Sequence, residues 1–373
     1  MSSPLSHVSA LGQSVWIDFL SRESIREGHL ERLIDEDSVV GATSNPTIFQ
    51  KAMTAGNAYD EQLRKEAGRG SNVKETFWAL AERDIKDACD LFREVWDGGA
   101  GRDGYVSLEV DPGLAYDTLA TYREAIRLHE AVDRPNLMVK IPATKPGVAA
   151  IEDVIAKGHS INVTLIFSLR RYADVAESYT RGIERLIAAG GDPRKVASVA
   201  SFFVSRIDTE ADRRLDELDP ARAGGISIDD LEGKLAVANA KLAYQHYKAA
   251  FAGPRWEYLA DKGATPQRVL WASTSTKNPA YRDTMYVEEL IGADTVNTMP
   301  EETIRDFQDH GKPAPRLEQG VAQAKRLLEE LAAAGVDYED LTDTLEREGV
   351  EKFSASFDEL LEALGEKQAE LAS

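Results

Sequence analysis

Eight short, largely apolar stretches recur along the chain, and each is typical of a buried β-strand. The segments between them carry apolar residues at three- and four-residue spacing, which predicts helices; Asn72–Asp97 and Ser168–Gly190 are examples, the second with Ser168 as its N-cap. The predicted strands are Val15–Leu20, Val39–Asn45, Gly104–Pro112, Asn136–Thr144, Ser160–Ser168, Val196–Asp208, Arg268–Thr276 and Asp294–Pro300.

Eight strands that alternate with helices predict a parallel sheet of the α/β class, and a closed (β/α)₈ TIM barrel matches this count best. An open doubly wound sheet is the alternative, but no Gly-x-Gly-x-x-Gly follows the first strand. We expect a single domain over residues 1–373, with the barrel strands at about 15–300 and a C-terminal helical extension at about 301–373.

Further segments exceed the minimal barrel and are expected to decorate it with N- and C-terminal helices. A short helix is predicted before the first strand, and a linker at residues 219–225 interrupts the long connection between the sixth and seventh strands. The corresponding ranges are Met1–Gly12 for the first helix, Leu231–Phe251 for a helix after the linker, and Arg316–Ala334 and Tyr338–Leu371 for two acidic amphipathic helices.

Composition narrows the classes of function. The chain has 373 residues, 43% of them hydrophobic, which is ample for a large core. Its net charge of −20 argues against nucleic acid as a partner, although a phosphorylated small molecule remains compatible if a few cations are placed locally. No apolar run has the length of a membrane span. The single cysteine, Cys89, excludes an intrachain disulfide and favours a reducing, cytoplasmic location.

Lys140 is the most informative residue, because it lies within the apolar stretch Asn136–Thr144. An ammonium group buried without a partner loses its solvation and tends to become neutral. A neutral lysine amine is a nucleophile towards carbonyl carbon, which is the chemistry of Schiff bases. The alternative is a lysine that is paired with a carboxylate or reaches solvent, and the sequence leaves both open.

Alternation along the strands sorts polar residues onto one face. Glu109 and Asp111 share a face, Asn162 and Thr164 share another, and Asp18 lies opposite to its apolar neighbours. If each strand gives an apolar face to the helices and a polar pair to the lumen, these residues meet Lys140 near the carboxyl ends of the strands, where barrel active sites are built.

Four motifs in register resemble the signatures of the transaldolase family. They are Thr43-Ser-Asn-Pro-Thr47, Ser107-Leu-Glu-Val-Asp-Pro112, Val139-Lys-Ile-Pro-Ala-Thr144 and Asn162-Val-Thr-Leu-Ile-Phe-Ser168. The resemblance implies a barrel like that of class I aldolases, and transfer of a dihydroxyacetone unit from sedoheptulose 7-phosphate to glyceraldehyde 3-phosphate, giving erythrose 4-phosphate and fructose 6-phosphate. It implies that the reaction belongs to the non-oxidative pentose phosphate pathway.

The resemblance also assigns the catalytic roles. Lys140 is expected to form the Schiff base with the C2 ketone, and Glu109 to shuttle protons through a water held by Thr164. Asp18 is expected to take the proton of the C4 hydroxyl while the C3–C4 bond breaks. The protonated imine accepts the electrons, so the resemblance implies neither a metal nor a cofactor.

Six further residues are expected to bind substrate. Asn45, Asn162 and Ser201 match positions that hold the hydroxyls of the three-carbon unit. Arg206 matches the phosphate-binding arginine of the family, its alternative being a salt bridge at the barrel rim. Ser273 and Lys277 come from Ala272-Ser-Thr-Ser-Thr-Lys-Asn278. This stretch departs from the usual motif, in which an arginine follows the serine closely, because Lys277 comes later, after an apparent two-residue insertion, and a lysine binds phosphate as a point charge.

Two other functions are compatible with parts of this pattern. A Schiff-base aldolase would release free dihydroxyacetone, but a different acid/base residue accompanies that activity, and the presence of both Glu109 and Asp18 favours transfer. A scaffold protein with a degraded site would have lost the lysine or the acids, and this chain retains them. The sequence leaves open a monomer or a homodimer and the role of the C-terminal helices.

Overall fold

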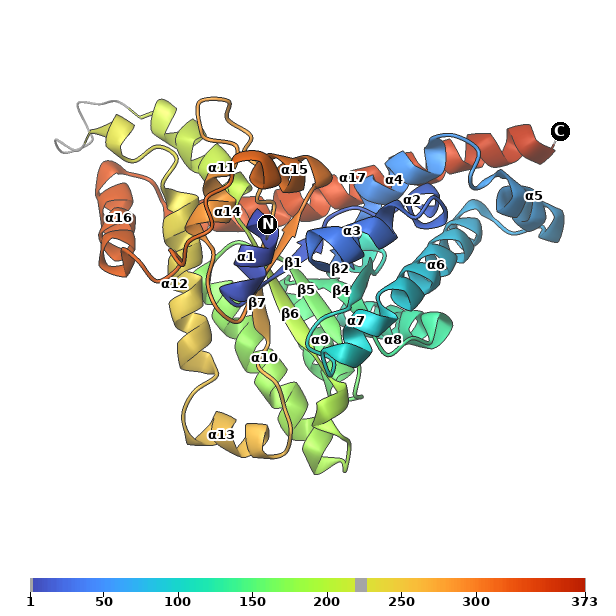
Figure 1. The fold of residues 1–373 in the computed structure, drawn as a ribbon, viewed down its shortest axis with the longest axis horizontal. Helices are drawn as coiled ribbons and strands as arrows, with labels where there is room; N and C mark the ends of the chain where they lie inside the picture. Colours follow the sequence, from blue (N-terminus) through green and yellow to red (C-terminus); the bar gives the residue numbers. More distant parts are fainter. Residues whose placement is uncertain (1–2, 219–226, 373) are drawn as a thin grey trace.

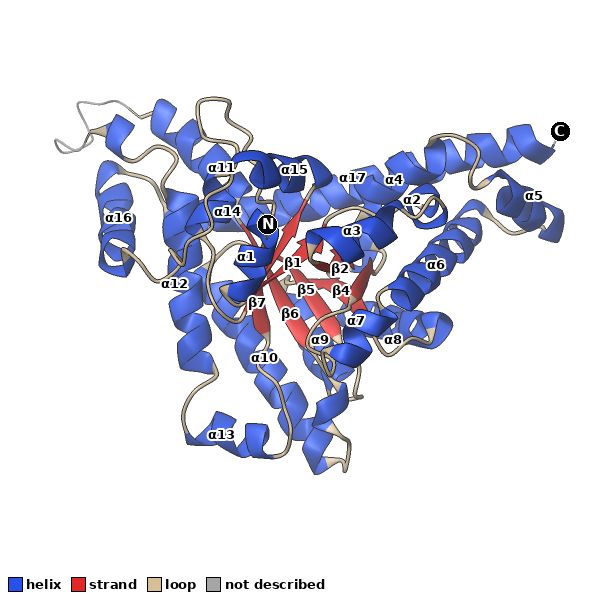
Figure 2. Cartoon of the chain, in the orientation of Figure 1, coloured by secondary structure: helices blue, strands red, loops and turns tan. Residues whose placement is uncertain are grey.

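The computed structural model describes residues 3–218 and 227–372 and contains a closed barrel of eight parallel strands, surrounded by helices (Figure 2). The strands follow chain order, and β8 pairs with β1 to complete the barrel. This confirms the predicted TIM barrel. The strands are β1 Gln13–Ile17, β2 Val39–Thr43, β3 Val106–Glu109, β4 Leu137–Pro142, β5 Ile161–Ile166, β6 Ser198–Phe203, β7 Arg268–Ala272 and β8 Thr295–Met299.

Seventeen α-helices lie among the described residues, and those that alternate with the strands cover the outside of the barrel (Figure 1). Their bounds are α1 Pro4–Ala10, α2 Arg22–Arg26, α3 His29–Asp37, α4 Pro46–Thr54, α5 Asp60–Arg69, α6 Val73–Leu91, α7 Arg93–Gly98, α8 Thr118–Val132, α9 Lys145–Ile155, α10 Leu169–Ala188, α11 Ser205–Asp216, α12 Leu235–Ala250, α13 Pro254–Asp261, α14 Met285–Glu289, α15 Glu301–His310, α16 Val321–Ala334 and α17 Tyr338–Ala372. None is long and apolar enough to cross a membrane.

All eight strands end earlier than the sequence suggested, and the difference is largest for the sixth and the seventh. The prediction of a strand over Val196–Asp208 was wrong in its last part, because α11 begins at Ser205 and carries Asp208 in its first turn, where an acid favours a helix N-terminus. The seventh strand ends at Ala272, since Ser273 adopts a positive φ of 58°, which is incompatible with a strand.

Most predicted helices are present with shifted ends. The amide of Arg171 donates to the Ser168 hydroxyl, which confirms the N-cap of α10. The single helix expected over Asn72–Asp97 is two helices, α6 and α7, because Phe92 lies between them outside helical geometry. The helix after the linker begins at Leu235 and α16 begins at Val321. The linker at residues 219–225 lies outside the described residues, and the single-domain organisation stays a prediction.

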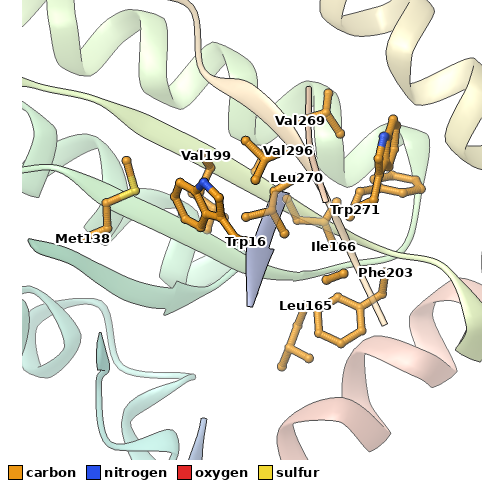
Figure 3. Close-up of a cluster of buried hydrophobic side chains, with 14 of the residues drawn as sticks. Trp16, Met138, Leu165, Ile166, Val199, Phe203, Val269, Leu270, Trp271 and Val296 are labelled. Carbon is orange, nitrogen blue, oxygen red and sulfur yellow. The ribbon is translucent and has the colours of Figure 1, made fainter. Parts of the chain in front are cut away.

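The lower part of the lumen is filled by apolar side chains. Trp16, Val199, Leu270 and Val296 belong to one cluster of buried hydrophobic residues (Figure 3). The expectation of a polar pair from every strand was therefore wrong: an apolar layer separates the polar residues at the carboxyl ends of the strands from those at the amino end, and packing stabilises this layer. Gly41 of β2 belongs to this layer, because a Cβ at this position would lie 2.6 Å from the Trp16 ring.

A hydrogen-bonded cluster closes the amino end of the barrel. The Arg268 guanidinium donates to the Ser14 hydroxyl at 2.8 Å and to Asp103 Oδ1 at 2.9 Å. Asp103 also accepts from Ser14 and from the indole nitrogen of Trp16. Arg268 is only 7% exposed, so its charge is buried and neutralised by Asp103. We refer to Ser14, Trp16, Asp103 and Arg268 as the basal cluster.

Helix α17 crosses the opposite end of the barrel, and its last turns extend beyond it (Figure 1). It contacts β5 as well as α4 and α11, which follow the carboxyl ends of β2 and β6. Helix α17 therefore covers part of the barrel mouth.

The packing of Gly41 against Trp16 generates a test of the lumen. Gly41→Ala should lower the free energy of unfolding by about 1–3 kcal/mol, because the added methyl group overlaps the indole ring. Gly68→Ala in α5 is the control: nothing lies within 4 Å of its Cβ position, and alanine favours the helix by about 1 kcal/mol. Urea unfolding of both variants checks the prediction, which equal stability of Gly41→Ala and native protein would contradict.

Candidate active site

Lys140 and Glu109 lie side by side at the carboxyl ends of β4 and β3, where they are register partners. Both residues are 5% exposed, and Lys140 Nζ is 3.6 Å from Glu109 Oε2, an ion-pair separation longer than a hydrogen bond. Lys140 Nζ donates instead to the backbone oxygen of Ser44 at 3.1 Å. The lysine is thus buried and paired, with its amine directed towards the barrel mouth.

The carboxyl group of Glu109 has an unusual environment. Burial raises its pKa to about 7, against opposing effects of Lys140 and Arg206, and the charge of Asp18 raises it further. Neither of its oxygens has a hydrogen-bond partner among the described residues, and the same holds for the buried hydroxyl of Thr164. Buried polar atoms are normally satisfied, so these groups are typical of a site that serves a reactant.

Asp18 follows β1 and is held at the rim by a chain of hydroxyl groups. Thr43 Oγ1 donates to Asp18 Oδ1 at 2.5 Å and lies 2.8 Å from Thr298 Oγ1. The backbone amide of Asp18 donates to the Met299 oxygen, which fixes the residue beside the end of β8. The carboxylate is partly buried, and its charge acts on both Glu109 and Arg206.

Asn162 and Ser201 form a fixed polar pair within the lumen. The Ser201 hydroxyl donates to Asn162 Oδ1 at 2.7 Å, and Asn162 Nδ2 donates to the Ser107 hydroxyl at 3.0 Å. Asn162 is the register partner of Lys140. The amide is therefore oriented next to the lysine before any ligand binds, which suits recognition of a hydroxyl group.

Asn45 has a structural role as well as a place at the site. Its side-chain oxygen accepts from the amide of Ile48 and caps α4, so this atom is already used. Asn45 also lines a narrow cavity together with Glu109 and Phe357. Its neighbour Ser44 supplies the oxygen that accepts from Lys140.

Arg206 is the second residue of α11 and not a strand residue. Its guanidinium lies 5.2 Å from the Phe203 ring centroid, and its Nη1 is buried without a hydrogen-bond partner. Burial lowers the pKa of Arg206, although arginine stays charged, and it makes no ion pair with a carboxylate of the described residues. The rim salt bridge considered as an alternative is therefore absent from the described part of the chain, and the cation is available to an anion.

Ser273 lies beside the start of α11, whereas Lys277 lies in an exposed loop. The Ser273 hydroxyl is 2.8 Å from that of Ser205, and the backbone of Ser205 donates to the Ser273 oxygen, so Ser273 lies beside the start of α11. Lys277 is exposed and donates to Ser275. It lines a surface cavity of about 700 Å³ with Arg282 and other residues, and no hydrogen bond or ion pair of the described residues joins it to Arg206.

Asp111 does not lie on the same face as Glu109, contrary to the expectation from alternation along the strand. β3 ends at Glu109, and Asp111 caps a turn by accepting from the amide of Gly113 and pairs with Lys74 of α6. Alternation holds only within a strand, so the shared face of Glu109 and Asp111 is lost two residues later. Asp111 is not part of this site.

Other contributors to the site were missed in the sequence. Thr43 and Ser44 belong to a quoted motif, but their roles as partners of Asp18 and Lys140 depend on packing between strands. Phe353 of α17 lies with its ring centroid 5.9 Å from Lys140 Nζ, and only the fold reveals this contact. No group of three or more His, Cys, Asp or Glu in residues 3–218 and 227–372 is arranged to hold a metal ion.

Comparison with known proteins agrees with this geometry. Residues 15–364 match the family described as Transaldolase/Fructose-6-phosphate aldolase. The chain belongs to this family. It is 52% identical to a transaldolase of Parafrankia sp. (strain EAN1pec) over 374 aligned residues, which cover all of both chains. Transaldolases of Acidothermus cellulolyticus and Mycolicibacterium paratuberculosis are 52% and 49% identical and align with 98% and 99% of this chain, and with 96% and 97% of their own. Transaldolase/fructose-6-phosphate aldolase family membership thus extends over the barrel and most of α17.

The raised pKa of Glu109 generates a prediction for stability. The folded protein binds this proton more tightly than the unfolded chain, so the stabilisation is complete below about pH 4.5 and is lost as the pH rises towards about 7. Relative to Glu109→Gln, the free energy of unfolding of the native protein should fall across this window, on the order of 2–3 kcal/mol. Urea titrations at several pH values check it, with Glu61→Gln on exposed α5 as control. A constant difference would contradict it.

Proposed function

We propose that this protein is a transaldolase, which transfers a dihydroxyacetone unit from sedoheptulose 7-phosphate to glyceraldehyde 3-phosphate. The products are erythrose 4-phosphate and fructose 6-phosphate, as in the non-oxidative pentose phosphate pathway. The observation that carries the proposal is the buried Lys140–Glu109 pair at the carboxyl mouth of the barrel. The relatives named transaldolase, at about 50% identity over nearly the whole chain, support it.

The first half of the reaction requires a nucleophile and a proton carrier. Lys140 attacks the C2 carbonyl of the ketose, and loss of water from the carbinolamine gives the protonated imine. Glu109 lies 3.6 Å from the amine and has a pKa of about 7, so it takes and returns protons near neutral pH. Thr164 is proposed to hold the water that carries these protons, and its buried hydroxyl without a partner supports this role.

The second half breaks and remakes one carbon–carbon bond. Asp18 takes the C4 hydroxyl proton, the C3–C4 electron pair moves into the imine, and the aldose phosphate leaves. The remaining enamine is held through its hydroxyls by Asn162 and Ser201, which are already oriented towards each other, and by Asn45. Addition of C3 to the aldehyde of the second aldose phosphate reverses these steps, and the product ketose leaves Lys140.

The phosphate of each sugar is proposed to bind at the start of α11. Arg206 supplies a guanidinium without a carboxylate partner, Ser273 lies beside the helix N-terminus, and the positive end of the helix dipole there favours anions. Lys277 is proposed to add a more distant positive charge from the loop after β7. Because the whole chain carries a charge of −20, this local group of cations is needed to attract an anionic substrate.

A Schiff-base aldolase that releases dihydroxyacetone is the second candidate, because the description of the family includes fructose-6-phosphate aldolase. The two functions differ in the fate of the enamine. Incubation with fructose 6-phosphate and erythrose 4-phosphate separates them: a transaldolase forms sedoheptulose 7-phosphate, whereas an aldolase accumulates free dihydroxyacetone. We further propose a cytoplasmic location, which the single cysteine supports because no intrachain disulfide depends on an oxidising compartment.

Lys140→Ala should abolish turnover while the barrel stays folded, because Glu109 becomes neutral by taking a proton when its partner is removed. Borohydride reduction with fructose 6-phosphate should leave a three-carbon adduct on Lys140 of the native protein, identified by mass spectrometry of the digested peptides. Lys145→Ala, the exposed lysine at the start of α9, is the matched control and should keep activity and adduct. Turnover by Lys140→Ala near the native level would rule out the mechanism.

Lys277→Ala should raise KM for phosphorylated sugars more than it lowers kcat, because it removes an attraction that acts equally on ground and transition states. Arg206→Gln should have a larger effect, about tenfold or more in KM, since a buried cation is lost. Lys312→Ala changes another exposed lysine of the Lys277 cavity and should leave KM unchanged. Steady-state kinetics decides: a native KM for Lys277→Ala would show that this lysine has no part in phosphate binding.

A further inference from the structure

Phe353 brings an aromatic ring from the C-terminal helix to the nucleophile. Its ring centroid lies 5.9 Å from Lys140 Nζ and 5.9 Å from Arg206 Cζ, and the residue is 6% exposed. A single side chain of α17 therefore contacts both the Schiff-base lysine and the cation proposed to bind phosphate. The ring carries no group that could take part in proton transfer, so its contribution must come from its shape and its apolar surface.

The helix holds this ring firmly in place. Gly349 and Phe357 lie one turn before and one turn after Phe353, on the same face of α17. Gly349 allows the helix to approach the end of β5, since a Cβ there would be 3.0 Å from Leu165, and Phe357 packs edge-on against Phe77 at 5.0 Å between centroids. The close approach of the backbone at Gly349 and the contact between Phe357 and Phe77 fix how far the Phe353 ring reaches towards Lys140.

Ion pairs tie both ends of α17 to the rest of the chain. Glu346 pairs with Arg171 of α10 at 3.0 Å, and Lys367 pairs with Asp60 of α5 at 3.0 Å. All four side chains are less than a quarter exposed, so solvent screens these pairs less than ordinary surface pairs. A helix anchored on both sides of the mouth keeps its central residue over the lumen.

Chemically, the enamine on Lys140 has two fates. In transfer, C3 forms a bond to the carbonyl carbon of the acceptor. In release, C3 takes a proton, the oxygen of one water molecule adds to C2, and the C2–N bond breaks to give dihydroxyacetone and the free amine. Release consumes one water molecule for each molecule of dihydroxyacetone, whereas the bond-forming step of transfer consumes none. Hydrolysis of the imine completes both routes, so the step that decides between the two fates is protonation of C3, and access of further water to the enamine favours this step.

We propose that Phe353 is a positioning residue that keeps water from the Lys140-bound enamine and thereby sets the ratio of transfer to release. This inference rests on the proposed function of the Lys140 site. Removal of the ring would leave a cavity lined by Lys140 and Arg206, and polar walls of this kind hold water where apolar walls stay dry. Proton transfer by Glu109 and the oriented amide of Asn162 do not depend on the ring.

The test measures the partition of the enamine directly. Native protein and Phe353→Ala are incubated with fructose 6-phosphate and erythrose 4-phosphate, and free dihydroxyacetone and sedoheptulose 7-phosphate are quantified over time. Phe353→Ala should raise the ratio of released to transferred product by about tenfold or more. Phe353→Leu restores apolar bulk and should return the ratio most of the way to the native value. A purely structural role for Phe353 would lower both products together and leave their ratio unchanged.

Leu360→Ala separates the ring from the seating of the helix. Leu360 is fully buried on the same face of α17, roughly 10 Å further along the axis. The Leu360→Ala variant should keep the native ratio of released to transferred product even if the substitution destabilises the helix. A rise in this ratio equal to that of Phe353→Ala would overturn the proposal. An unchanged ratio in Phe353→Ala, with transfer by the native protein intact, would overturn it as well. Native protein that forms no sedoheptulose 7-phosphate would overturn the proposed function itself.

Discussion

The burial of two ionisable side chains next to one another is the constraint on which this site depends. Lys140 and Glu109 are each 5% exposed, and removing both charges from water is costly unless they compensate each other. The compensation is partial: their closest atoms are 3.6 Å apart, and the pKa of Glu109 rises to about 7. A carboxyl group near its ionisation point at neutral pH exchanges protons readily. The conflict between burial and charge thus supports the proton-transfer role that we propose for Glu109.

The scaffold keeps this pair in place by dividing the lumen into two layers. Below, Trp16, Val199 and their neighbours fill the barrel with apolar side chains, and Gly41 makes room for the indole ring. Above, the strands end in polar residues whose orientations are set by neighbouring strands, as Ser201 sets that of Asn162. The rigid lower layer fixes the spacing of the strands, and the spacing fixes the distances between reactive groups.

Much of this architecture was accessible from the sequence, because a buried strand has a clear signature. The eight apolar stretches and their alternation with helices predicted the closed barrel, and Lys140 within such a stretch predicted a reactive site. Strand ends were less accessible: Arg206 was placed on a strand but belongs to α11, and Asp111 leaves the face of Glu109 because β3 stops first. Local pattern does not encode where a strand ends or which loop follows it in space.

Contacts between distant parts of the chain could not be predicted from the sequence. The apolar spacing of α17 predicted an amphipathic helix, but not the surface that the helix covers. That surface is fixed by Gly349 against Leu165 and by the anchoring pairs, each of which joins residues more than 150 positions apart. Likewise, nothing in the local sequence around Thr43 relates it to Asp18 or to Thr298. Such contacts follow only once the barrel has closed.

The basal cluster determines from which end of the barrel a molecule can reach Lys140. With Arg268, Asp103, Ser14 and Trp16 joined by hydrogen bonds and the apolar layer packed above them, nothing passes through the amino end. Lys140 is thus reached from one side only, and in the reaction that we propose each product leaves by the route along which the next reactant arrives. A barrel that is closed at one end imposes an order on the proposed reaction: the first aldose phosphate must leave the mouth before a second can bind there.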